Sequence, residues 1–300
     1  MFSIRSVVAT IVLQVAIVCL FSLPVSGHEG LHEQIIAVTK QIRKSPKDPA
    51  LYLKRAELYR LHEEWKNAEA DLVRAERLDR NLTAVDLGWG KLWLDAKQFS
   101  KAHTALEKYL LKQPNSFEGA ITMARVLAKL KKTDTSINYF TKAIVLAPHD
   151  SAEIYLERTE VLATAGRIDE ALSGLDEGIK KLGTLVTLQN AAIELEVRRR
   201  RYDLALERLD ILAVAMPRKE TFLLRRGEIL LQAGRPCEAR SSLIESQSGF
   251  DALPVPRKNV RAVRGQMVRI QALLNSESVR KCPLAGGRPQ IPQSLSSTSR

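Results

Sequence analysis

The stretch Pro49–Leu82, PALYLKRAELYRLHEEWKNAEADLVRAERLDRNL, decides the fold of this 300-residue chain. Apolar or small residues recur in it at helical spacing, at Tyr52, Ala56 and Tyr59 and then at Ala68, Leu72 and Ala75. A break near residues 62–64 separates the two runs. The stretch therefore predicts a helix, a turn and a second helix.

The same pattern returns along most of the chain at intervals of 34 or 35 residues. The small residues that open the second helices are Ala68, Ala102, Ser136, Ala171, Ala205 and Ala239. The small or weakly bulky residues about twelve positions earlier are Ala56, Gly90, Ala124, Thr159, Gly227 and, in the fifth copy, Ala192 or Ile193. Small side chains are needed at both places because a large one would push two crossing helices apart. Pro114, Pro148 and Pro217 mark the ends of copies, where a helix must stop.

This pattern resembles the tetratricopeptide repeat (TPR), a helix-turn-helix unit of 34 residues. The resemblance covers residues 49–253 in six copies. It implies an all-α fold, a right-handed α-solenoid of about six such repeats, in which each repeat packs mainly on its neighbours. Thr133, Gly178 and Gly183 depart from the pattern and affect the local register rather than the fold.

Residues 1–27 have the composition of a secretory signal peptide. Arg5 precedes an apolar stretch from Val7 to Leu23, and small residues follow as far as Gly27. We expect cleavage after Gly27, so that the mature protein begins at His28 and is exported to a periplasm or to the outside of the cell. An uncleaved membrane anchor is the alternative, because the apolar stretch is long for a signal peptide.

Two capping helices are predicted at the ends of the solenoid. In residues 28–48, one helix face carries Leu31, Ile35, Val38 and Ile42. In residues 254–283, a helix over 257–275 carries the apolar stripe Val260, Val263, Met267, Ile270 and Leu274. Such caps cover apolar surface that the terminal repeats would otherwise expose. Residues 284–300 are rich in Gly, Pro, Ser and Gln and are predicted to be disordered.

The formal net charge of +12 would suit a nucleic-acid-binding protein, but its distribution argues against one. Residues 28–253 carry 36 basic and 33 acidic residues, whereas residues 254–300 carry nine basic residues and one acidic residue. The basic excess therefore lies in the C-terminal cap, where Arg257, Arg261 and Arg264 share one face. This face could contact anionic lipid headgroups or cell-surface polymers, or it could belong to a merely soluble cap.

Motifs of catalysis and cofactor binding are absent from the sequence. It has no HExxH motif, no phosphate-binding glycine loop and no CxxC pair, so we predict a protein that is not an enzyme and uses no cofactor. His28 and His32, with a free terminal amine, offer a possible metal site. Two histidines without cysteine are weak evidence for one, and an acid-rich helix start explains the same residues, so no metal site is predicted.

In the resembling family, the first helices line a concave groove that receives peptides or partner segments. The resemblance places the following residues of this chain in that groove: Glu57, Lys91, Arg125, Glu160, Asn190, Glu194 and Glu228. Mixed charge suits a protein ligand better than a polyanion. We therefore predict a non-catalytic protein–protein interaction scaffold that acts outside the cytoplasm and binds no nucleic acid. The alternatives are an envelope or surface assembly factor that works through the basic C-terminal helix, and an exported metal-binding protein that uses His28 and His32.

Three local features carry predictions of their own. Cys237 and Cys282 are the only cysteines left after cleavage, so export predicts a disulfide between them, with two free thiols as the alternative. The run Arg198–Arg201 is either an anion-binding patch or a solvated helix end. Asn81 begins an Asn-Leu-Thr glycosylation acceptor pattern, which matters only if the source cell glycosylates exported proteins.

Overall fold

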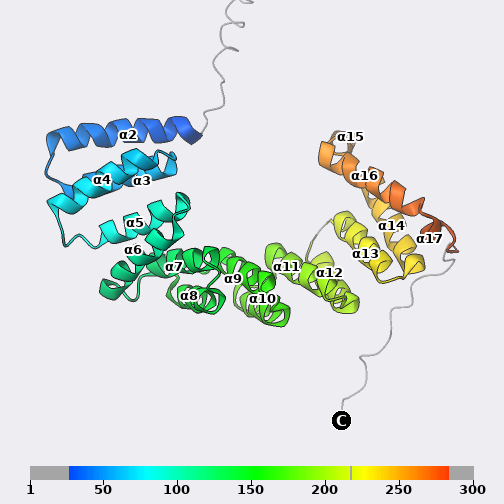
Figure 1. Cartoon of the computed structure of the whole chain (residues 1–300). Coiled ribbons are helices and arrows are strands. Elements are labelled where there is room, and N and C mark those ends of the chain that lie inside the picture. The colour runs from blue at the N-terminus through cyan, green and yellow to red at the C-terminus, as the bar shows by residue number, and fades with distance from the viewer. Residues whose placement is uncertain (1–26, 217, 284–300) are drawn as a thin grey trace, which may run out of the picture. The chain divides into compact units, whose positions relative to one another are not determined.

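A computed structural model describes residues 27–216 and 218–283, and these residues form helices joined by short loops (Figure 1). The predicted signal peptide and the predicted disordered tail fall almost entirely on residues 1–26 and 284–300, outside the described residues. Among the helices that are described, none is long and apolar enough to cross a membrane. The chain divides into two compact units, residues 1–146 and residues 147–300.

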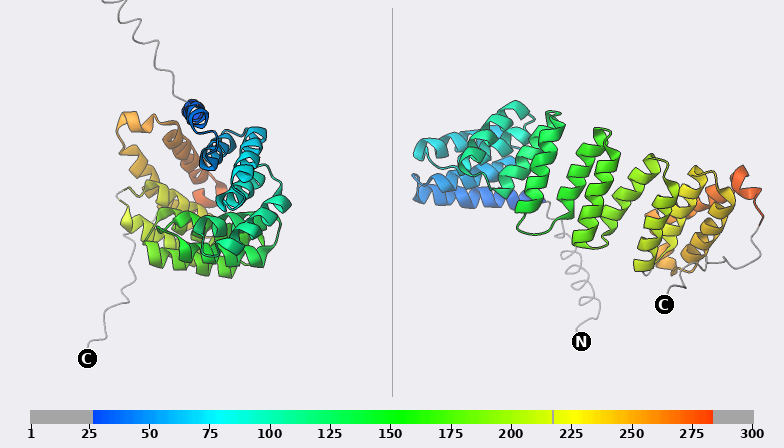
Figure 2. Two further views of the ribbon diagram at one scale, coloured as in Figure 1. Left: turned by 90° about the vertical axis from the view of Figure 1, so that its left-hand side faces the viewer. Right: turned by 90° about the horizontal axis from the view of Figure 1, so that it is seen from below.

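Over residues 27–146, the first unit contains one single helix followed by three helix pairs. The single helix is α2 (Gly27–Lys44). The pairs are α3 (Pro49–Leu61) with α4 (Trp65–Leu78), α5 (Ala84–Asp95) with α6 (Phe99–Lys112), and α7 (Phe117–Lys129) with α8 (Thr133–Leu146). The two helices of each pair pack side by side, and α3, α5 and α7 also contact one another in succession (Figure 2). The first helices of successive repeats therefore share one surface.

The second unit contains three further pairs and a C-terminal segment. The pairs are α9 (Ala152–Thr164) with α10 (Ile168–Leu182), α11 (Val186–Arg198) with α12 (Tyr202–Ala215), and α13 (Glu220–Gln232) with α14 (Pro236–Asp251). The C-terminal segment contains α15 (Val255–Lys258), α16 (Arg261–Leu274) and α17 (Glu277–Arg280). The predicted all-α stack of helix-turn-helix units is thus confirmed.

Small residues sit where the helices of a pair cross. All six residues predicted to open the second helices are fully buried: Ala68, Ala102, Ser136, Ala171, Ala205 and Ala239. A Cβ atom at Gly90 would lie 2.6 Å from the Leu106 side chain, and one at Gly227 would lie 2.7 Å from Leu243. Because carbon atoms cannot approach so closely, a larger residue at either glycine would force the pair apart.

All six helix pairs have the same turn. The residue before the last in each turn has a positive φ: Glu63 (62°), Lys97 (58°), Lys131 (58°), Gly166 (78°), Arg200 (58°) and Gly234 (73°). The next backbone N–H donates to the carbonyl five residues earlier, as Glu64 N–H does to the Tyr59 carbonyl at 2.8 Å. This is the Schellman motif, which satisfies the last carbonyls of a helix. The sequence analysis did not predict it, because only two of the six positions are glycine.

The N-terminal helix α2 packs on the first repeat as predicted. Ile35, Val38 and Ile42 are buried in one cluster with Tyr52 and Ala56. Polar contacts reinforce this packing: the Arg55 guanidinium donates to both carboxylate oxygens of Asp71, at 2.6 and 2.7 Å, and to the Thr39 hydroxyl at 3.0 Å. Three helices, α2, α3 and α4, are tied together by this one side chain.

The C-terminal cap differs from the single helix predicted over residues 257–275. Helix α15 ends at Lys258, and Val260 has an extended backbone (φ −63°, ψ 130°) just before α16 begins. This break turns Val260 out of the apolar stripe, and its side chain is 49% exposed. The rest of the stripe packs as predicted against Leu243 and Phe250: Val263, Met267, Ile270 and Leu274.

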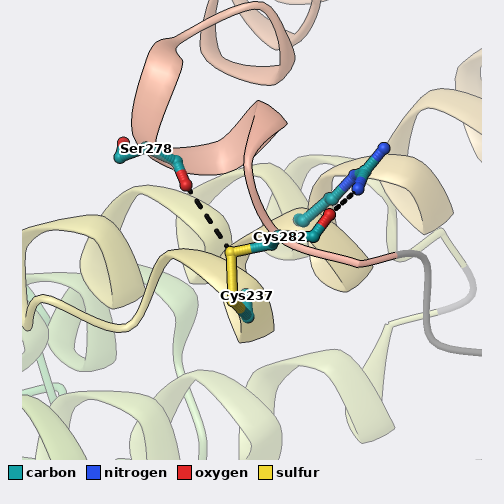
Figure 3. The surroundings of a disulfide bond; sticks show 4 residues. Cys237, Ser278 and Cys282 are labelled. Carbon is teal, nitrogen blue, oxygen red and sulfur yellow. Dashed lines mark hydrogen bonds between the residues drawn. A yellow bond between two sulfur atoms is a disulfide. The ribbon is translucent and has the colours of Figure 1, made fainter.

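A disulfide bond and a hydrogen bond hold the end of the cap against α14 (Figure 3). The sulfur atoms of Cys237, near the start of α14, and Cys282, just after α17, lie 2.10 Å apart, and the two Cα atoms are 5.1 Å apart. The Arg240 guanidinium donates a hydrogen bond to the Cys282 carbonyl. The structure thus joins the two cysteines that the sequence analysis paired.

Candidate functional site

The first helices of the first two repeats line a cavity of about 410 Å³, called here the α3–α5 groove. Its apolar lining residues are Ala50, Leu53, Ala56, Leu58, Leu72, Ala84, Leu87 and Leu92. Its charged lining residues are Lys54, Glu57, Arg60, Lys91 and Glu118. Gly88 completes the lining. The groove therefore offers an apolar floor with charges of both signs beside it.

Helical spacing explains why these residues meet. Positions 50, 53, 54, 57 and 60 of α3 lie three or four residues apart, as do positions 84, 87, 88 and 91 of α5, so each set lies on one helix face. Gly88 lets α5 approach the first repeat, because a Cβ atom there would lie 2.7 Å from the Leu72 side chain and 3.2 Å from the Leu53 side chain. A glycine is needed where α5 passes over the two leucines.

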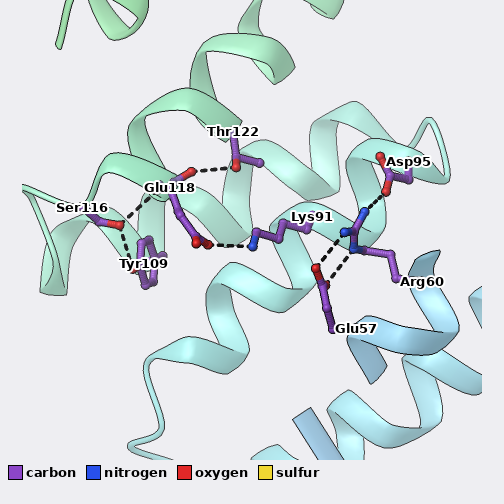
Figure 4. A network of polar contacts seen from close by, with 9 residues as sticks. Glu57, Arg60, Lys91, Asp95, Tyr109, Ser116, Glu118 and Thr122 are labelled. Carbon is purple, nitrogen blue, oxygen red and sulfur yellow. Dashed lines mark hydrogen bonds and ion pairs between the residues drawn. The ribbon is translucent and has the colours of Figure 1, made fainter. Parts of the chain in front are cut away.

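Arg60 is the central charge of the groove wall. Its guanidinium makes two hydrogen bonds of 2.8 Å to the Glu57 carboxylate and also pairs with Asp95 at the end of α5 (Figure 4). The Arg60 side chain is only 15% exposed, whereas its partners Glu57 and Asp95 are 40% and 37% exposed, so both ion pairs reach solvent. Hydrogen bonding to Arg60 lowers the pKa of Glu57, and hydrogen bonding to Glu57 raises the pKa of Arg60. Both groups are therefore charged at neutral pH.

A second ion pair crosses from the second repeat to the third. The Lys91 ammonium on α5 lies 2.7 Å from the Glu118 carboxylate on α7. Helix capping positions that carboxylate: the Ser116 hydroxyl accepts from Gly119 N–H at 3.1 Å, and it accepts from the Tyr109 hydroxyl at 2.9 Å (Figure 4). Glu118 thus lies in the first turn of α7, where a negative charge also suits the helix dipole.

These pairings decide what the groove can do chemically. Its acids and bases are matched to each other, and Lys54 is the lining charge that has no ion-pair partner among the described residues. The lining contains no Ser, Thr, Cys, His or Tyr, so it offers no hydroxyl, thiol or imidazole for nucleophilic or general-base catalysis. Its apolar floor is the part available to a ligand without breaking an ion pair.

Only part of the predicted groove set meets in this cavity. Glu57 and Lys91 line it, and half-buried Arg125 lies farther along the chain on α7. Glu160 on α9 and Asn190 and Glu194 on α11 are exposed in the second unit. The prediction for these residues stays a prediction.

Glu228 has a different environment from the other predicted groove residues. Its side chain is only 11% exposed, lies 3.3 Å from Arg225, and also pairs with Arg269 of α16. Arg225 pairs with Glu194 as well, so it links α11 to α13. The C-terminal cap therefore covers Glu228 rather than leaving it open to a ligand.

Sequence reasoning missed three of the charged lining residues. Arg60 follows Glu57 by three positions, a spacing at which helical side chains meet, so this signal was present. Lys54 shares the face of Leu53 but was not considered. Glu118 lies 27 residues from its partner Lys91, and no local sequence pattern predicts an ion pair over such a separation.

The arginine run Arg198–Arg201 links repeats within the second unit. Arg199 and Arg201 both pair with Asp169 at the start of α10, at 3.0 and 2.7 Å. Arg198 donates to the Ala163 carbonyl at 3.3 Å. Three of the four cations thus contact the preceding repeat, while Arg198, Arg199 and Arg200 remain exposed to solvent.

No group of three or more His, Cys, Asp or Glu side chains suited to a metal ion occurs among the residues that the structure describes. His32 is exposed, and the side chain of His28 lies outside the described part of the chain. The alternative of an exported metal-binding protein therefore stays a prediction.

Comparisons with known proteins point to one family. The family model of the tetratricopeptide repeat matches residues 190–246. The solved structure of PilF from Pseudomonas aeruginosa is 13% identical, covers 75% of this chain and 96% of its own, and has a TM-score of 0.50. A tetratricopeptide repeat protein from Parabacteroides merdae is 14% identical and covers 81% of this chain and 98% of its own, with a TM-score of 0.48.

YrrB, described as a TPR protein with an unusual peptide-binding site, is 24% identical and covers 60% of this chain and 93% of its own, with a TM-score of 0.48. No curated protein matches the sequence. At 13% identity, the likeness to PilF shows the fold and nothing beyond it.

Proposed function

We propose that this tetratricopeptide-repeat protein is a non-catalytic interaction scaffold that binds a peptide segment of a partner protein in the α3–α5 groove. The observation that carries the proposal is the groove itself, a cavity of about 410 Å³ with an apolar floor and charges of both signs beside it. Ligand sites of proteins have this size and are mostly apolar, with a few polar groups that orient the ligand.

The lining indicates which kind of segment fits. Leu53 and Leu87 form floor positions on neighbouring helices, so two apolar side chains of a ligand could be buried there. Burying one such side chain contributes about 1.5–3 kcal/mol. The charged pairs Glu57–Arg60 and Lys91–Glu118 would favour a segment that carries both signs of charge over a polyanion. Lys54 would attract a carboxylate of the bound peptide segment.

The proposed place of action is outside the cytoplasm. This part rests on the order of charged, apolar and small residues in 1–27 and on the Cys237–Cys282 disulfide. Disulfides persist in oxidising compartments and are rare in the cytosol.

The decisive experiment fills the groove without touching its ion pairs. Ala84 is exposed and lines the groove, whereas Ala70 on α4 is equally exposed and does not line it. Peptides selected from a random library against the protein would be measured by fluorescence anisotropy with Ala84→Trp and with the matched control Ala70→Trp. We expect Ala84→Trp to weaken binding about ten-fold or more, because the indole excludes at least one apolar side chain of the ligand.

Equal binding by the two variants would refute the proposal, and so would a library that yields no binder at all. Circular dichroism and thermal melting of both variants would verify that the added tryptophans leave the helices intact.

A further inference from the structure

A second surface is built on the C-terminal cap and is separate from the α3–α5 groove. It consists of exposed valines and arginines of α15, of α16 and of the turn between them, and is called here the Val/Arg face. Its members are Val255, Arg257, Val260, Arg261, Arg264 and Val268. Val255 is 69% exposed and Val268 is 70% exposed, so both present apolar surface to solvent.

Most of the other described arginines in the second unit are held in ion pairs. Arg158, Arg208 and Arg235 each pair with a carboxylate at 2.6–2.8 Å. Arg257, Arg261 and Arg264 have no ion-pair partner among the described residues. No acidic residue occurs between positions 252 and 276.

The opposite side of α16 already has its packing partners. Ile270 is fully buried with Leu243 and Phe250, and Arg269, whose side chain is 64% exposed, pairs with Glu228. The disulfide between Cys282 and Cys237 ties the segment after α16, which contains α17, to α14 (Figure 3). Arg261, Arg264 and Val268 of the Val/Arg face therefore lie on a helix, α16, that is already anchored to the scaffold.

We propose that the Val/Arg face binds an anionic lipid surface. Charge complementarity selects an anionic partner, and the interleaved valines select a lipid over a soluble polyanion. A helix with cationic and apolar side chains on one side lies at the boundary between headgroups and acyl chains. There the cations contact anionic headgroups and the apolar side chains are buried among the acyl chains. A phosphate or sulfate polymer would contact the arginines but gain nothing from the exposed valines.

The test compares vesicles of phosphatidylcholine with and without phosphatidylserine, using co-sedimentation of the full chain at low salt. The apolar stretch between Val7 and Leu23 should strengthen binding to both vesicle types by the same factor. The measured quantity is therefore the affinity for vesicles with phosphatidylserine divided by the affinity for vesicles without it. Each Lys or Arg near an anionic membrane strengthens binding about five-fold. We expect Arg261→Glu with Arg264→Glu to lower the phosphatidylserine affinity by about 30-fold or more.

This variant should fold, because Arg261 and Arg264 lie in the first turn or so of α16, where glutamate suits the helix dipole. The matched control is Arg77→Glu with Arg80→Glu, which changes the net charge equally at two exposed arginines of the same spacing in the first unit. The control should leave the ratio of affinities unchanged. A second variant, Val268→Gln, should weaken binding to the vesicles several-fold and leave binding to heparin unaltered.

Equal losses in the Arg261/Arg264 variant and in its control would overturn the proposal. So would tight heparin binding combined with no effect of Val268→Gln on vesicles, since that result would assign the face to a soluble polyanion.

Discussion

The same replacement, glutamate to glycine, should change the stability of the protein in opposite directions in the turn between paired helices and within a helix. Glu63 in the first turn has φ 62°, in the left-handed region, whereas Glu69 lies within α4. Both side chains are exposed, and neither has a hydrogen bond or an ion pair among the described residues. Replacing each glutamate by glycine therefore removes no side-chain contact and acts on the backbone alone.

The magnitudes follow from backbone energetics. A residue with a Cβ atom costs about 1–2 kcal/mol in the left-handed region, a cost that glycine does not have. Glycine also loses more backbone entropy on folding, which offsets about 0.5–1 kcal/mol of that gain. We expect Glu63→Gly to stabilise the protein by about 0.5–1 kcal/mol and Glu69→Gly to destabilise it by about 1 kcal/mol.

The assay is urea unfolding followed by the helical circular dichroism signal. A difference of about 1.5–2 kcal/mol between the two variants separates their midpoints by about 1 M at a typical slope near 2 kcal/mol/M. Because repeat stacks can unfold in parts, the first transition is the one to compare. Gly166→Ala is the reverse control: Gly166 has φ 78° and open space around its Cβ position, so any loss there comes from the backbone. The reasoning fails if Glu63→Gly destabilises the protein as much as Glu69→Gly does.

Three further predictions concern the disulfide, the groove and the N-terminus. Replacing Cys237 and Cys282 by serine should lower the stability of the disulfide-bonded protein by about 4 kcal/mol in the chain-entropy model for a separation of 45 residues. A maleimide should label neither Cys237 nor Cys282 of the unreduced protein in urea. The pKa of Glu57 lies below its ordinary value of 4.5 in the folded protein, so its contribution to stability is present above pH 4.5 and is lost as the pH falls through the lowered value. The stability difference between the natural protein and Glu57→Gln should therefore shrink below pH 4.5, and a difference that is constant with pH would contradict the role given to Arg60. Intact mass of the exported protein should correspond to a chain that starts at His28, and a mass that retains residues 1–27 would instead support the membrane anchor.

The helix pairs were predictable from the sequence because their causes are local and periodic. Ala56 and Ala68 recur with equivalents at 34 or 35 residues, and a small side chain at such a position is a direct requirement of close helix crossing. The resemblance to the tetratricopeptide repeat placed Glu57 and Lys91 in one groove, and both line the observed cavity.

The tertiary structure alone decided how the charges are used. Arg60 pairs with Asp95 across 35 residues and Lys91 pairs with Glu118 across 27, and such partners depend on how neighbouring repeats stack. The left-handed conformation of four turn residues could not be predicted from the sequence either: Glu63, Lys97, Lys131 and Arg200. The Schellman hydrogen bonds impose this conformation on residue types that do not prefer it.

The C-terminal cap combines features that the sequence predicts with features that only the tertiary structure sets. The apolar stripe of α16 could be predicted from helical spacing. The break before Arg261 and the exposure of Val260 and Val268 could not. Helical spacing is a property of the segment itself, so it can be read from the sequence. The side of a helix that stays exposed depends on which surfaces the other helices cover, and that is settled only when the chain has folded.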